Sequence, residues 1–83
     1  MDIIKAKYLS DYKIELTFEN NIKKVVDFEE FLMHERNPMT TEFRNMNLFK
    51  KFKIEGGDLS WKNYQMCFPG EALYHWEEVL MQH

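Results

Sequence analysis

Three histidines and one cysteine are the residues of this sequence whose side chains could bind a soft metal ion or act as a nucleophile. They are His34, His75, His83 and Cys67, and no C-x-x-C or H-x-x-x-H spacing brings two of them together. A metal site needs several converging ligands, and a catalytic nucleophile needs a neighbouring base. The sequence therefore predicts no metal site, no cofactor and no enzyme activity.

One pairing of carboxylate and imidazole groups fits the spacing near the C-terminus. Glu71 lies four residues before His75, and Glu78 lies three residues after it, so the three can share one face of a helix. An exposed pairing on the helix surface is favoured over a catalytic cluster. Cys67 is expected to behave as a small buried apolar group, because no residue near it in the sequence would lower the pKa of its thiol.

Lysines in and beside the predicted strands form the second candidate site. Interleaved with Tyr8, Tyr12 or Phe52, they would combine a positive surface with aromatic rings, as proteins that bind single-stranded nucleic acid do. The competing interpretation is a solvated face, or lysines that protect an edge strand against aggregation. The residues are Lys5, Lys7, Lys23 and Lys24 and, as the predicted nucleic-acid contacts, Lys50, Lys51 and Lys53.

Alternation of apolar and polar residues predicts three consecutive strands at the start of the chain, over residues 4–8, 12–18 and 22–26. The second strand has the clearest pattern, with four apolar side chains on one face. Ser10-Asp11 and Asn20-Asn21 have the turn chemistry that connects such strands.

The middle of the chain predicts two short helices. Asp27 followed by Glu30 has the spacing of a capping box for the first helix, which Pro38 is expected to end. Thr40 or Thr41 is expected to cap the second helix, and residues 49–55 are expected to form an extended run after it.

The last third of the chain predicts a strand pair and a longer helix. Gly56-Gly57-Asp58 marks a reversal, and residues 59–61 and 64–68 continue an alternating pattern in which Trp61 is favoured as a core residue over a binding hot spot. Pro69 then opens the main amphipathic helix. Its apolar stripe consists of Ala72, Leu73, Trp76, Val79 and Leu80.

Composition restricts the class of protein. With 83 residues, 45% of them hydrophobic, the chain can build one core, so residues 1–83 are expected to form a single domain. The lone cysteine and the absence of a signal-peptide pattern favour a cytoplasmic setting, and no apolar run is long enough to span a membrane. The net charge of −3 argues weakly against a dedicated nucleic-acid binder.

The order of these residues resembles the domain of unknown function 2442 family (DUF2442), a family of small bacterial proteins. The resemblance covers about residues 3–75 and is carried by residues 8–27 and 49–54 and by a structural signature in the last third. The chain departs from the family pattern at Lys62, Tyr64, Met66 and Phe68. The signature consists of Trp61, Asn63, Pro69, Leu73 and Tyr74.

The resemblance implies a scaffold but no catalytic residues and no small-molecule substrate. Family members often lie beside another small protein in arrangements like those of toxins and antitoxins. We therefore expect an α+β domain in which an antiparallel sheet of about five to six short strands packs with two short middle helices and a C-terminal amphipathic helix. The expected function is a non-enzymatic interaction domain that binds a protein partner or itself, in one form as an antitoxin-like accessory protein. The alternative is weak nucleic-acid binding through the lysines.

Overall fold

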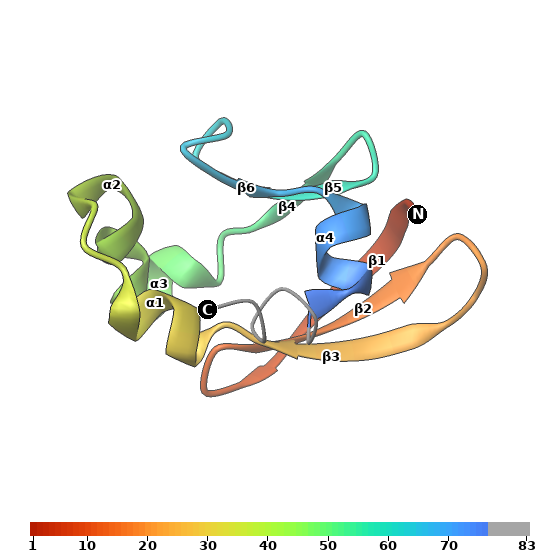
Figure 1. The fold of residues 1–83 in the computed structure, drawn as a ribbon, viewed down its shortest axis with the longest axis horizontal. Helices are drawn as coiled ribbons and strands as arrows, with labels where there is room; N and C mark the ends of the chain where they lie inside the picture. Colours follow the sequence, from red (N-terminus) through yellow and green to blue (C-terminus); the bar gives the residue numbers. More distant parts are fainter. Residues whose placement is uncertain (77–83) are drawn as a thin grey trace.

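The computed structural model describes residues 1–76, in which six strands form two antiparallel three-stranded sheets (Figure 1). The first sheet has the order β1 (Ile3–Ser10), β2 (Lys13–Phe18), β3 (Lys23–Asp27). The second has the order β4 (Lys53–Glu55), β5 (Asp58–Trp61), β6 (Met66–Phe68). The predicted α+β class and number of strands are confirmed, with the strands divided between two sheets.

Side-chain alternation explains how the first sheet buries one face. Ile14 and Leu16 on β2 and Val26 on β3 are almost fully buried, while residues between them point to the outer face. The predicted three-strand order is confirmed, although β2 begins at Lys13 because Asp11 and Tyr12 have φ values of 46° and 66° and form the preceding turn.

The first middle helix begins differently from the prediction. α1 (Glu29–His34) has Phe28 at its N-cap and no capping hydrogen bond from a side chain, so the capping box is wrong. The Asp27 carboxylate instead accepts a hydrogen bond from the Glu29 backbone N–H at 2.9 Å, two residues along. This local turn leads the chain out of β3 and into the helix.

Asparagines, not threonines, start the next two helices. Asn37 caps α2 (Pro38–Thr41), and Pro38 occupies its first turn, where a missing N–H costs nothing. α1 already ends at His34 and does not continue to Pro38, which opens a helix of its own, whereas the predicted cap at Thr40 or Thr41 is wrong. A 3₁₀ turn, η1 (Glu42–Arg44), leads to α3 (Met46–Phe49), which Asn45 caps. The extended run predicted from residue 49 begins only at β4.

The region after β5 is more sharply turned than its alternating sequence indicates. Lys62, Asn63 and Tyr64 all have positive φ values, so the second run predicted from residue 64 begins at Met66. α4 (Gly70–Tyr74) then lies between the two sheets in Figure 1. Val79 and Leu80, expected on the stripe of this helix, lie outside the described residues.

An aromatic cluster fills the core. The ring of Phe28 lies 5.8 Å from both Phe49 and Trp61 and 5.4 Å from Trp76, measured between centroids. These four rings come from the segment after β3, from α3, from β5 and from the segment after α4. The cluster therefore joins the two sheets and the helices into one core.

Candidate interaction surface on the first sheet

The outer face of the first sheet carries most of the strand lysines. Lys5, Thr17 and Lys23 are paired across its three strands, as are Lys7, Glu15 and Val25. All except Val25 line one open hollow, together with Ala6. Three lysines and one glutamate give this hollow a mixed but predominantly positive character.

Val25 is the apolar exception on this face. Val25 is 54% exposed, although valine is usually buried when it lies in a strand of a small sheet. Lys23 and Asp27, two residues before and after it, point to the same side and are also exposed. The outer side of β3 thus presents a valine between a positive and a negative charge.

The backbone of β3 is open on the side away from β2. The N–H of Phe28 donates to Tyr12 and the C=O of Ile22 accepts from Phe18, so even-numbered residues of this segment face β2. The N–H and C=O groups of Lys23, Val25 and Asp27 therefore point outward. Among residues 1–76, one hydrogen bond reaches these outward groups: the Trp76 indole N–H donates to the Asp27 carbonyl at 3.2 Å.

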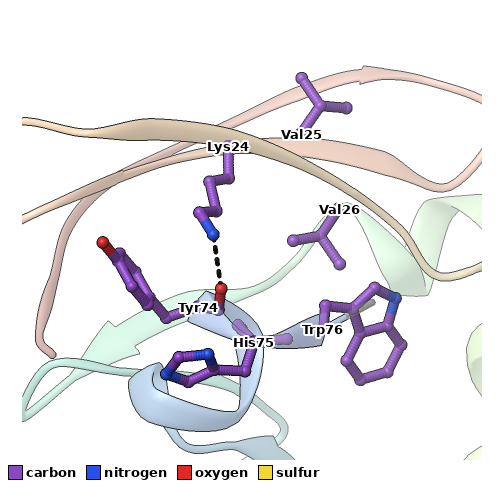
Figure 2. A pocket seen from close by; sticks show the side chains of 7 residues that line it. Lys24, Val25, Val26, Tyr74, His75 and Trp76 are labelled. Carbon is purple, nitrogen blue, oxygen red and sulfur yellow. Dashed lines mark hydrogen bonds between the residues drawn. The ribbon is translucent and has the colours of Figure 1, made fainter. Parts of the chain in front are cut away.

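The opposite face of β3 meets α4. Figure 2 shows Lys24 and Val26 directed toward Tyr74, His75 and Trp76, whereas Val25 points away. The Lys24 ammonium donates to the Tyr74 carbonyl at 2.7 Å and lies 4.2 Å from the centre of the Tyr74 ring. The hollow here measures about 320 Å³, near the lower limit for ligand pockets. Its one ammonium group is already engaged by Tyr74, and its other titratable side chain, His75, interacts with Glu71.

The predicted nucleic-acid contacts lie apart from the outer face of the first sheet. Lys50 and Lys51 follow α3, and Lys53 is on β4 of the second sheet. The Lys50 ammonium lies 4.8 Å from the centre of the Tyr8 ring, on the side of β1 opposite Lys5 and Lys7. The seven lysines are therefore distributed over at least three parts of the surface rather than one.

The five signature residues lie in and around the unit from β5 to α4. Trp61 is 1% exposed and its indole N–H donates to the Phe49 carbonyl at 2.6 Å. Leu73 is fully buried, and the Tyr74 ring packs edge-on against Phe18 at 5.0 Å. Asn63 has a φ of 52° in the turn after β5, and Pro69 is the N-cap of α4.

The titratable candidates form one pair. His75 Nε2 lies 3.2 Å from Glu71 Oε1, and the second carboxylate oxygen of Glu71 accepts from the amino group of Met1 at 2.8 Å. The amino group, followed by His75, holds the pKa of Glu71 below its ordinary value. Glu78 and His83 lie outside the described residues.

The other two candidates stand apart from that pair. His34 is exposed at the end of α1, and Cys67 is half-buried on β6, where burial raises the pKa of its thiol. No three His, Cys, Asp or Glu side chains within residues 1–76 are placed to hold a metal ion. No helix in that range is long and apolar enough to cross a membrane.

Sequence reasoning missed the exposed Val25 and the role of Arg44. The Arg44 guanidinium donates to the carbonyls of Leu32, Met33 and Glu35 at the end of α1. Val25 had one detectable signal, since the odd-numbered positions of its strand are otherwise charged. Arg44 had none, because the helix it caps lies about ten residues earlier.

Comparison with known proteins gives a family and no individual relative. No curated protein and no solved structure matches the chain. One family model matches residues 3–79, and its description is 'Protein of unknown function (DUF2442)'. The chain therefore belongs to the DUF2442 family.

Proposed function

We propose that this protein is a non-enzymatic, cytoplasmic interaction domain that binds a protein partner or a second copy of itself through the first sheet. The observation that supports this proposal is β3, where a half-exposed valine lies on a strand whose outward backbone groups, except the Asp27 carbonyl, have no partner within residues 1–76. Such an edge can accept a strand from a partner, with main-chain hydrogen bonds giving affinity and alternate side chains giving specificity. An antitoxin-like accessory protein that binds the product of a neighbouring gene is the form that the family resemblance favours.

The test is co-purification with the product of a neighbouring small gene, and growth of cells that express that product with and without this protein. Binding and relief of toxicity are expected, and Val25→Lys should weaken both because it places a charge at the centre of the edge. Ile54→Lys is the matched control, since Ile54 is a 36% exposed aliphatic residue on the other sheet. If the neighbour neither co-purifies nor is toxic, the antitoxin form is wrong.

Weak nucleic-acid binding is the second candidate function, and the three lysines of the outer face favour it. Lys5, Lys7 and Lys23 line one hollow, so a phosphate backbone crossing the sheet would meet all three. Fluorescence anisotropy with single- and double-stranded oligonucleotides at about 50 mM salt tests the idea. Replacement of these three by glutamate should abolish binding, and the same change at Lys50, Lys51 and Lys53 tests the contacts predicted from sequence. If the protein binds no oligonucleotide at that salt concentration, both groups of lysines are rejected as nucleic-acid contacts.

A further inference from the structure

We infer that β3 pairs with β3 of a second copy of this chain, so that two first sheets join into one continuous antiparallel sheet. This inference rests on the proposed interaction role of β3 and names its occupant. The geometry, the charges and the form of the other sheet edges each support it.

The register follows from the direction of the backbone groups. A twofold axis perpendicular to the sheet at Val25 places Val25 opposite Val25 of the partner copy. The outward N–H and C=O groups of both valines then form a closely spaced pair of hydrogen bonds, as an antiparallel ladder requires. Lys23 and Asp27 have outward groups too, and the Asp27 carbonyl keeps a second acceptor site beside the one that Trp76 uses.

The same register is complementary in charge. In the sequence Lys-Lys-Val-Val-Asp of β3, a twofold centred on Val25 sets Lys23 opposite Asp27 of the other copy, twice per dimer. Both side chains are exposed and lie on the outer face beside the valines. Opposite charges directly across two strands stabilise their pairing, and the apolar contact between the valines adds to it.

The second lysine of β3 does not oppose this pairing. Lys24 points to the other face, where its ammonium is held by the carbonyl and ring of Tyr74. Of the two lysines of β3, only Lys23 lies on the outer face, and in the dimer it lies opposite the Asp27 carboxylate of the other copy. From the sequence, Lys23 and Lys24 could be lysines that protect an edge strand against aggregation. In the structure, they do not oppose pairing in the register centred on Val25.

The other sheet edges within residues 1–76 are less suited to pairing. β1 has register irregularities between Ile3 and Lys5 and between Tyr8 and Ser10, and its start is bonded to Gly57. β4 and β6 have three residues each. Irregular and very short edges are the usual means by which proteins prevent edge pairing. β3 has five residues and an unbroken register with β2.

Sedimentation equilibrium of the purified protein from about 10 μM to about 1 mM tests the inference, because one strand pair gives a small interface and a weak dimer. A monomer–dimer equilibrium is expected. Amide exchange measured by NMR at the two ends of this range should show that the Val25 N–H becomes protected as the dimer forms. A monomer throughout, or a dimer in which the Val25 N–H stays unprotected, overturns the inference.

A charge exchange identifies the register. Lys23→Asp sets like charges opposite each other twice, and so does Asp27→Lys, so each variant alone should dimerise at least about tenfold more weakly. Mixing the two variants restores both opposite-charge pairs, and a mixed dimer should form with about the affinity of the original protein. Lys7→Asp is the control, because it makes the same charge change on the same face but on β1. Its dimerisation should be unchanged.

The two variants and the control must first show melting temperatures near that of the original protein. If the mixture of Lys23→Asp and Asp27→Lys fails to associate while both are folded, the register is wrong. These measurements use this protein alone. A negative result would therefore overturn the dimer but would not decide whether a neighbouring gene product binds, which has its own test. Conversely, if the neighbouring product neither co-purifies nor is toxic, the antitoxin form is rejected, while a dimer of this protein alone still supports the present inference.

Discussion

Trp61 combines two interactions that different substitutions separate. Its ring packs among five phenylalanines, while its indole N–H satisfies the Phe49 carbonyl at the end of α3. The packing links β5 to α3 and the segment after β3, and the hydrogen bond fixes the end of that helix. The phenylalanines are Phe28, Phe43, Phe49, Phe52 and Phe68.

Trp61→Ala should therefore destabilise the protein severely. Truncation of a large buried aromatic costs about 3–5 kcal/mol, out of the roughly 5–15 kcal/mol by which a domain is stable. Trp61→Phe keeps much of the packing but leaves the Phe49 carbonyl without its donor, so its cost should be smaller, about 1–3 kcal/mol. Denaturant unfolding measures both. If Trp61→Ala left stability unchanged and abolished partner binding, Trp61 would be a hot spot and its structural role would be wrong.

Glu42 gives a prediction about pH. The ammonium of Lys62 lies 2.6 Å from its carboxylate and, as the first of several causes, holds the pKa of Glu42 below its ordinary value of 4.5. The folded protein therefore binds this proton less readily than the unfolded chain does. The resulting stabilisation is present above pH 4.5 and is lost as the pH falls through the lowered pKa.

An NMR titration of the Glu42 side chain checks this directly. In the original protein the midpoint should lie below 4.5, and Lys62→Gln should move it back toward that value. Lys51→Gln is the control, because Lys51 is exposed in the turn after α3 and forms no ion pair within residues 1–76. A Glu42 midpoint that Lys62→Gln leaves unchanged would show that the ion pair is not formed in solution.

The positions where the helices begin were the feature of the fold that the sequence predicted least well. The strands of the first sheet followed from a period of two, which the pleat imposes on every residue. The starts of the helices depended on Asn37, Asn45 and a turn at Asp27, and many residues nearby have equally good capping chemistry. The outer face of β3 was not predicted either, because its open edge depends on how strands pair across the chain.

Arg44 is the clearest case of an element held by a residue distant in sequence. Its guanidinium donates to three carbonyls at the end of α1, a helix of six residues that could not be stable alone. Arg44→Met should keep the aliphatic packing and lose these hydrogen bonds, at a cost of about 1 kcal/mol. Hydrogen exchange should show faster opening of the α1 amides.

Arg36→Met is the matched control for that measurement. Arg36 is exposed in the loop after α1, and within residues 1–76 its guanidinium donates no hydrogen bond. Its replacement should leave exchange in α1 unchanged. Equal effects of the two substitutions would mean that net charge, and not the three carbonyl contacts, stabilises the helix end.

At the scale of the whole molecule, two small sheets must be held together without a continuous ladder between them. Two hydrogen bonds add to the aromatic cluster at the junction: the Ile3 N–H donates to the Gly57 carbonyl, and the Gly70 N–H donates to the Asp58 carboxylate. The start of β1, the turn after β4 and the start of α4 therefore meet at one place. The chain reversal at Gly56-Gly57-Asp58 thus has a structural role in joining the sheets.

Gly70→Ala should open this junction. A Cβ at Gly70 would lie 2.3 Å from the Met1 carbonyl oxygen and 2.7 Å from that of Gly57, and both are backbone atoms that cannot rotate away. Overpacking of this kind costs about 1–3 kcal/mol. Gly56→Ala is the comparison, because a Cβ there meets nothing within 4 Å and only the φ of +57° is unfavourable. NMR spectra of Gly70→Ala should show shifts in β1, in the turn at Gly57 and in α4 together, whereas those of Gly56→Ala should be confined to the turn. If the shifts in Gly70→Ala stayed within α4, the two sheets would be held by the aromatic cluster alone.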